Sequence, residues 1–163
     1  MSVADFAGSG STRERVEYLL VPSDDPRWRD AARALDPGEA LPVLAEALGP
    51  GRDARTRRMA VLIVGVIGDK RGIPLLLNVA DDTDPVLRAR VVEALAAVGP
   101  DPGAAQRVVD AAKDESAFVR ETAARALAAL ALPESPALLA QLAADPAPEV
   151  RRAVEDAKPG GGS

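Results

Sequence analysis

The stretch DTDPVLR, residues 82–88, places two carboxylates and a hydroxyl next to an arginine. Carboxylates at alternate positions are typical of calcium-binding loops, in which Asp82, Asp84 and Glu93 would stand at positions 1, 3 and 12. The match fails in between, because position 6 needs a glycine for its sharp turn and holds a leucine here, and because Pro85 is typical of a helix start. We therefore interpret the stretch as part of the frame and expect no metal site.

The stretch recurs along the chain. Aligned on the last arginine, four copies end at residues 57, 88, 120 and 151, so the intervals are 31, 32 and 31 residues, and an earlier copy ends at residue 29. An internal period of this length is typical of helical-repeat proteins. The five copies are SDDPRWR (23–29), GRDARTR (51–57), DTDPVLR (82–88), DESAFVR (114–120) and DPAPEVR (145–151).

Each copy is expected to begin a helix. Its third residue is Asp or Ser in the first four copies, and these side chains cap the free N–H groups of a helix start. Apolar residues then recur at helical spacing, as at Leu87, Val91 and Leu95. Glycines at positions 68 and 99 are typical of helix C-termini.

A second, shorter helix is predicted in each unit, at residues 39–48, 71–80, 103–112 and 135–144. No strand pattern competes with these helices, so the sequence predicts an all-α fold, a short right-handed α-solenoid of helical hairpins. Before the first unit, a Ser-x-x-Glu capping box predicts a helix at residues 11–21. The expected organisation is a disordered N-terminus (1–10), one repeat domain (11–158) with units at about 23–50, 51–81, 82–113 and 114–144, a terminal half unit (145–158), and a flexible tail (159–163).

The composition narrows the possible chemistry. Hydrophobic residues make up 47% of the 163 residues but aromatic residues only 2%, so alanine, leucine and valine must fill the core. Cysteine and histidine are both absent, which removes disulfides, thiolate metal sites and the commonest general base. We therefore expect no catalysis and no cofactor.

The charge is also unevenly distributed. The net charge is −5, because residues 1–80 carry 11 basic and 11 acidic side chains while residues 81–163 carry 9 and 14. An acidic chain is a poor match for nucleic acid, whose phosphates require a surplus of Lys and Arg. No stretch approaches the roughly 18 apolar residues of a membrane span, and the N-terminus lacks the features of a secretory signal. We expect a cytoplasmic monomer or weak homo-oligomer that binds neither nucleic acid nor membrane.

The repeated motif resembles a known family. The pattern Asp-x-Asp-Pro-x-Val/Leu-Arg, followed by a helix such as VVEALAAVG (91–99) or TAARALAAL (122–130), is similar to HEAT-like repeats, in particular the short bacterial type described in phycobilin lyase subunits. The resemblance covers about residues 23–157 and is most specific from residue 82 onward. It implies an α-solenoid and contact with another protein, although the family also includes lyase subunits and a DNA glycosylase branch.

The resemblance also implies a structural ladder, in which the aspartate and arginine of each motif form hydrogen bonds between successive turns. Because Ser23 and Gly51 stand in place of the aspartate in the earlier copies, the ladder is expected to stop toward the N-terminus. The ladder residues are Asp82, Arg88, Asp114, Arg120, Asp145 and Arg151.

Two groups of residues are candidates for partner binding. The concave face of such a solenoid is lined by the second helices, whose polar residues form a mixed groove suited to a peptide or a partner helix. They are Glu46, Asn78, Gln106, Arg107, Asp110 and Gln141. A basic cluster is a candidate contact for an acidic partner, although its ends lie about 20–25 Å apart along one predicted helix. It contains Arg52, Arg55, Arg58, Lys70 and Arg71.

These observations favour a noncatalytic adaptor or scaffold that binds another protein. One alternative is a subunit of a lyase-type or nucleic-acid-processing enzyme, which the lack of histidine and cysteine and the scarcity of base-stacking aromatics disfavour. Trp28 in particular occupies an apolar slot of the repeat and is expected in the core. A second alternative is a self-assembling element, if Val154 and Ala157 leave an apolar edge on the terminal helix.

Overall fold

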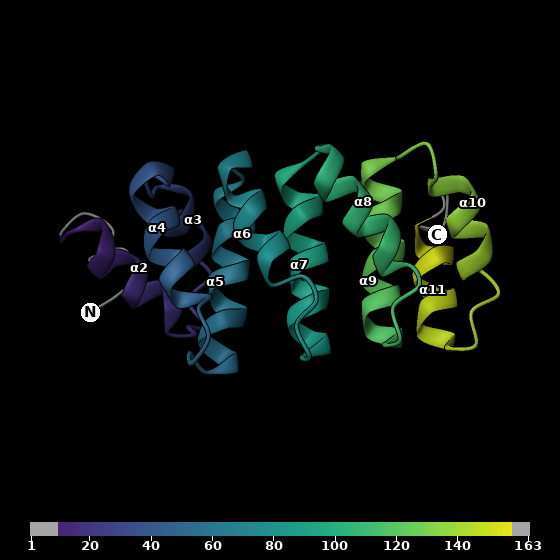
Figure 1. Cartoon of the computed structure of the whole chain (residues 1–163), viewed down its shortest axis with the longest axis horizontal. Helices are drawn as coiled ribbons and strands as arrows, with labels where there is room; N and C mark the ends of the chain where they lie inside the picture. The colour runs from purple at the N-terminus through teal and green to yellow at the C-terminus, as the bar shows by residue number, and fades with distance from the viewer. Residues whose placement is uncertain (1–9, 158–163) are drawn as a thin grey trace.

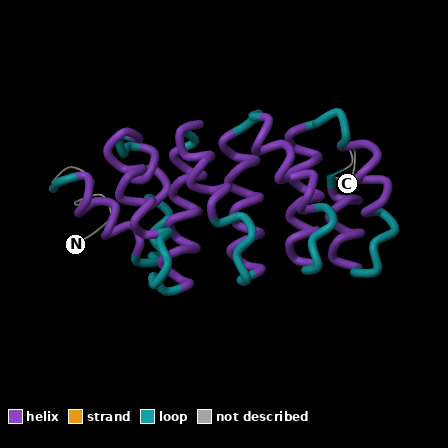
Figure 2. Tube along the Cα trace, viewed as in Figure 1, coloured by secondary structure: helices purple, strands orange, loops and turns teal. Residues whose placement is uncertain are grey.

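The chain forms a single row of helices (Figures 1 and 2). The structure is a computed structural model that describes residues 10–157, and it contains no strand within that range. The all-α repeat solenoid predicted from the sequence is therefore confirmed. The predicted flexible tail and nearly all of the predicted disordered N-terminus lie outside the described residues.

Each repeat contributes one helix to each of two layers. The first helices are α3 (Trp28–Arg33), α5 (Ala54–Ile67), α7 (Pro85–Val98), α9 (Ala117–Leu130) and α11 (Pro148–Asp156). The second helices are α4 (Pro37–Ala47), α6 (Ile73–Asn78), α8 (Pro102–Ala111) and α10 (Ser135–Leu142). The row begins with α2 (Thr12–Leu20), and a short 3-10 turn, η1 (Lys70–Gly72), precedes α6.

The layers differ in how their helices pack. From α5 to α11, each first helix lies directly against the first helix of the next repeat, whereas the second helices pack mainly against the first helices. The first helices α5 and α7 approach closely at Gly65, where a Cβ atom would come within 2.9 Å of Ala94. The core is correspondingly built of alanine, valine and leucine side chains, with Leu95 and Leu127 fully buried. No helix of the described residues is both long and apolar enough to span a bilayer.

Capping aspartates explain several of the helix starts. Asp53 accepts a hydrogen bond from the Thr56 N–H at 2.9 Å, and Asp84 accepts one from the Val86 N–H at 3.0 Å. The predicted capping box is present at the start of α2. Ser116 departs from the prediction, because its side chain makes no capping hydrogen bond at the start of α9.

The long first helices α5, α7 and α9 each end at a residue with a positive φ. Gly68 ends α5 with φ of 70°, and Gly99 ends α7 with φ of 99°. The equivalent residue of α9 is Ala131, with φ of 47° and ψ of 46°. A residue with a Cβ atom is strained in this conformation, so one repeat is capped less favourably than its neighbours.

Replacing Ala131 with glycine is therefore expected to raise the free energy of unfolding by about 0.5–1 kcal/mol, because removal of the Cβ relieves more strain than the added chain entropy costs. Urea unfolding followed by circular dichroism measures the change. Gly68→Ala is the matched reverse substitution and should lower stability by a similar amount or more. A loss of stability in Ala131→Gly would contradict the assigned backbone strain.

Leu127→Ala is expected to lower the free energy of unfolding by about 2–5 kcal/mol, because it leaves a cavity in the core where the leucine is fully buried. The same substitution at Leu139 of α10, which is only partly buried, should cost less. Thermal and urea unfolding of both variants provide the comparison, and equal losses would contradict the assigned helix face.

Candidate functional site

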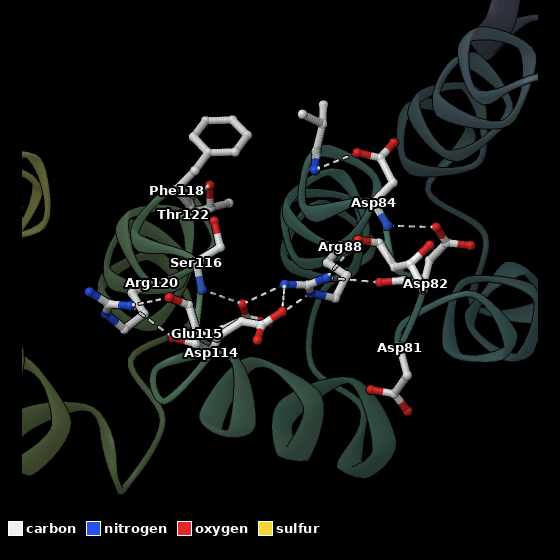
Figure 3. Close-up of polar contacts among 12 residues, drawn as sticks. Asp81, Asp82, Asp84, Arg88, Asp114, Glu115, Ser116, Phe118, Arg120 and Thr122 are labelled. Carbon is white, nitrogen blue, oxygen red and sulfur yellow. Dashed lines mark hydrogen bonds and ion pairs between the residues drawn. The ribbon is translucent and has the colours of Figure 1, made fainter.

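Arginines of the repeated motif bind the next repeat. The Nε and Nη2 atoms of Arg88 donate to the carboxylate of Asp114 at 2.9 and 2.8 Å, as Figure 3 shows. Arg120 repeats this geometry with Asp145, at 2.8 and 3.0 Å. Two parallel bonds from one guanidinium fix orientation as well as distance, so these pairs set how each repeat sits on the next.

The same arginines also bind their own repeat. The Nη1 atom of Arg88 donates to the backbone oxygen of Asp82 at 2.9 Å, and that of Arg120 donates to the backbone oxygen of Asp114 at 2.9 Å (Figure 3). Each guanidinium therefore links a loop of one repeat to a carboxylate of the following repeat. The last member, Arg151, keeps the bond to its own repeat, at 2.7 Å from the backbone oxygen of Asp145.

The ladder extends one step beyond Arg88 toward the N-terminus. Asp82 forms an ion pair with Arg57 at 2.7 Å, so its side-chain partner lies in the preceding repeat. For the next arginine in that direction, Arg29, the motif of the following repeat has Gly51 in place of the aspartate. Its guanidinium instead lies 5.3 Å from the centre of the Trp28 ring. The ladder thus stops toward the N-terminus where the carboxylate is missing.

Each ladder aspartate has a second role within its own loop. The carboxylates of Asp82, Asp114 and Asp145 each accept a hydrogen bond at 2.9 Å from the backbone N–H two residues later. This bond shapes the loop that enters the next first helix. At the start of α9, Asp114 holds the N–H of Ser116, the N-cap residue.

The pairs are shielded from water, and this governs their electrostatics. The side chains of Arg88 and Asp114 are 8% and 9% exposed. Burial raises the pKa of Asp114, but hydrogen bonds from Arg88 and from the Ser116 N–H outweigh it, so the net shift of the pKa is downward. The hydrogen bond from Arg120 likewise lowers the pKa of Asp145. Both carboxylates are therefore held in the ionised form.

Asp82 and Asp84, the candidate ligands of the metal interpretation, both contact arginines. Asp84 caps α7 and receives a 2.7 Å hydrogen bond from Nε of Arg58, which lowers the pKa of the carboxyl group. Asp82 is bound to Arg57. Among residues 10–157, no group of three or more acidic side chains is placed to hold a cation. The carboxylates of DTDPVLR are engaged by arginines and backbone N–H groups.

The basic cluster does not form one site. Arg58 is paired with Asp84 across the α5–α7 contact, which makes it part of the frame. Arg71 forms a double hydrogen bond with Asp69, at 2.9 and 2.8 Å, and this lowers the pKa of Asp69 to about 2. The remaining members are exposed but lie at opposite ends of α5. They are Arg52, Arg55 and Lys70.

Two of the six candidate residues on the second helices form polar contacts with other elements of the fold. Glu46 of α4 accepts two 2.8 Å hydrogen bonds from Arg13 of α2. Arg107 of α8 donates to the backbone oxygen of Ala80 and lies 3.3 Å from Asp81, so it ties α8 to the preceding repeat. The other four are exposed: Asn78, Gln106, Asp110 and Gln141.

Four of these six residues occupy equivalent positions. Glu46, Asn78, Asp110 and Gln141 follow one another at intervals of 32, 32 and 31 residues, and each lies one turn or less from the end of its second helix. They therefore form a row of polar side chains across α4, α6, α8 and α10, which we call the second-helix row. A hollow of about 450 Å³ between α4 and α6 is lined by Asn78, by apolar side chains and by the ladder pair Arg57 and Asp82.

The opposite face, formed by the first helices, holds features that the sequence did not reveal. Trp28 was expected in the core, but it is only partly buried and lines two hollows on this face. Phe118 is 41% exposed, and Figure 3 shows its ring projecting away from the ladder. The sequence signal for this site is the presence of alanines and aromatic residues at outward-facing helix positions. This signal is ambiguous, because the same residues fit a composition that simply favours helices.

The chain matches the family model described as HEAT repeats, over residues 20–96, 41–115 and 73–157. An engineered protein whose crystal structure was solved by a structural genomics consortium is similar in fold, with a TM-score of 0.61, 20% identity, and coverage of 91% of this chain and 78% of that one. A designed armadillo repeat protein is also similar, with a TM-score of 0.60, 18% identity, and coverage of 95% and 84%. No curated protein sequence matches the chain. The phycobilin lyase type stays a prediction.

Arg120→Ala is expected to lower the free energy of unfolding by about 1–3 kcal/mol, because it leaves the buried carboxylate of Asp145 without its charged donor. Arg125→Ala is the matched control on the same helix. Its guanidinium pairs only with Glu121 on an exposed surface, so the loss should stay within about 0.5 kcal/mol. Urea unfolding measures both, and equal effects would contradict the structural role of the ladder.

Acid should weaken the ladder. The pKa values of Asp84, Asp114 and Asp145 are lowered in the folded chain, so each carboxylate stabilises the fold above its unfolded pKa of about 4. That stability is lost as the pH falls through the lower folded value. Unfolding free energies measured between pH 7 and 2 should fall below about pH 4, and the fall should be shallower in Asp145→Asn. An unchanged slope in this variant would count against the pairing.

Proposed function

The chain belongs to the HEAT-repeat family, and from this we propose that it is a noncatalytic adaptor that binds another protein through the face lined by its second helices. The observation that carries the proposal is the second-helix row. Its four members hold equivalent positions in consecutive repeats, yet each is a different residue type or carries a different charge from its neighbours. The ladder residues are the same in successive repeats, whereas the residues of this row differ from repeat to repeat.

The chemistry of the row suits a peptide backbone. The amides of Asn78 and Gln141 each offer a donor and an acceptor, which matches the N–H and C=O groups of a peptide. Neighbouring helices pack on the order of 10 Å apart. This distance equals about three residues of extended chain, so a segment crossing the helices can present a group to each member of the row.

The adjacent hollow between α4 and α6 adds an apolar contact. Leu75, Ala45 and Val79 contribute to its lining next to Asn78, so an apolar side chain of the partner can be buried beside the polar row. A small apolar pocket flanked by hydrogen-bonding groups is typical of peptide recognition. Specificity would then come from the varied residues and orientation from the rigid frame.

The paired substitution Asn78→Arg with Gln141→Arg tests the proposal. Both residues are exposed, so the variant should keep its melting temperature while losing at least about tenfold of the partner protein recovered by affinity capture from the native cell extract. Arg152→Glu, at an exposed position of α11, is the control and should retain the partner. Equal recovery by both variants would exclude the second-helix row as the binding face.

A further inference from the structure

The face formed by the first helices carries two adjoining hollows, which we call the first-helix groove. One hollow, of about 420 Å³, lies between α7 and α9. The other, of about 360 Å³, lies among α3, α5 and α7. Glu93 of α7 lines both, so the two hollows meet across that helix.

Beside Glu93, the part of α7 that separates the hollows carries small side chains. Ala96 lines the first hollow and Ala97, the next residue of α7, lines the second. The far wall of the first hollow continues this pattern with Ala126 and Ala129 of α9. Small side chains on neighbouring helices leave room for a bound segment to pass from one hollow to the other.

Aromatic side chains stand at the two ends of the groove. Phe118 lines the α7–α9 hollow and is 41% exposed, and Trp28 lines the hollow on the other side of α7. The chain contains four aromatic residues, and Tyr18, the remaining one among those described, lines a third hollow that also includes Trp28. Aromatic residues and arginine are enriched where interfaces bind most strongly.

The charged side chains lining the groove are mainly arginines. Arg90 and Arg125 line the first hollow and Arg29 and Arg33 the second, with Glu93 as the single acidic residue lining either. Arg33 is paired with Asp30 of its own helix at 3.0 Å, so part of this positive charge is offset, although arginines still outnumber acidic residues in the lining.

The ion pairs of these arginines leave them able to bind a further carboxylate. Arg90 pairs with Glu93 through Nη1 at 2.7 Å, and Arg125 pairs with Glu121 through Nη2 at 2.6 Å. Each pair lies within one helix, is solvent-accessible on its arginine side, and uses one of the five N–H donors of a guanidinium. Such pairs are weak and salt-sensitive, so an incoming carboxylate can share or replace them.

We propose that the first-helix groove binds an acidic segment of a partner protein, with apolar side chains in the two hollows and carboxylates against the arginines. The apolar floor and the alanines of α7 favour a protein segment over a nucleic acid, which would bring a negative backbone close to an acidic chain. The groove spans α3 to α9, a distance of roughly 25–30 Å at ordinary helix spacing. About eight or nine extended residues cover it.

The inference goes beyond the proposed function, because it concerns the opposite face of the solenoid. A chain with a separate binding surface in each helix layer can hold two proteins at once. The first-helix groove is cationic and aromatic, whereas the second-helix row is acidic and amide-rich. The two surfaces therefore suit partners of different chemistry.

A random 12-residue peptide display library is the probe. Selection on the whole chain, with counter-selection on Phe118→Ala, should enrich peptides that combine Asp or Glu with apolar residues. Their binding can be followed through the fluorescence of Trp28, the one tryptophan of the chain. Phe118→Ala and Arg125→Glu should each weaken the selected peptides at least about tenfold, while Gln141→Arg on the second-helix row should change their affinity less than about twofold.

The outcomes separate this inference from the proposed function. Peptides that lose affinity with Gln141→Arg but not with Arg125→Glu would overturn the groove and leave the second-helix row supported. Selection of basic peptides, the absence of any enriched peptide, or tighter binding of a single-stranded oligonucleotide than of the selected peptides would also overturn the groove. Melting curves of Phe118→Ala and Arg125→Glu, both at exposed positions, confirm that the variants remain folded.

Discussion

The bidentate bond between an arginine of one repeat and an aspartate of the next is the constraint on which the solenoid depends. Arg88 uses three nitrogens at once, one on its own loop and two on Asp114, so neither the spacing nor the rotation of adjacent repeats can change without breaking a bond. The planar guanidinium is suited to this task, whereas a lysine ammonium lacks the fork that meets both carboxylate oxygens. Because the pair is shielded from water, removing one partner leaves an unpaired buried charge. Breaking the pair therefore strongly destabilises the folded chain.

This frame determines where function can reside. The ladder lies between the two helix layers, and from Asp82 onward its residues are the same in successive repeats, so they do not distinguish one partner from another. Side chains that point away from the ladder are free to differ, as the change from Asn78 to Asp110 along the second-helix row illustrates. Each member of the second-helix row lies in its own repeat of a rigid frame. The groups that would contact a partner are therefore already in place, and less conformational entropy is lost on binding. Variable residues on an invariant frame are the physical basis of an adaptor.

Much of the fold could be predicted from the sequence, but the site could be predicted only in part. The capping aspartates and the helical spacing of apolar residues predict the individual helices. The period of the motif then predicts that these helices are arranged as successive units of a solenoid. The sequence could not predict which aspartate each ladder arginine binds. Arg88 has one aspartate 6 residues before it and another 26 residues after it, and only the stacking of the repeats determines which carboxylate it contacts. Arg107 was assigned to partner binding for a similar reason, since its tie to Ala80 depends on a contact between repeats. The first-helix groove went unseen because alanines that build a helix and alanines that line a hollow look the same in sequence.

The last helix of the described residues, α11, departs from the repeat pattern at one position. The position held by Val92 in α7 and by Ala124 in α9, both buried, is occupied in α11 by Glu155, which is exposed. Val154, which could have left an apolar edge, is instead 4% exposed and packed into the core. A second copy stacked on this part of α11 would have to bury Glu155, and an unpaired carboxylate is expensive to remove from water. In the binding modes proposed above, the surfaces of the two helix layers differ in chemistry and would therefore suit different partners.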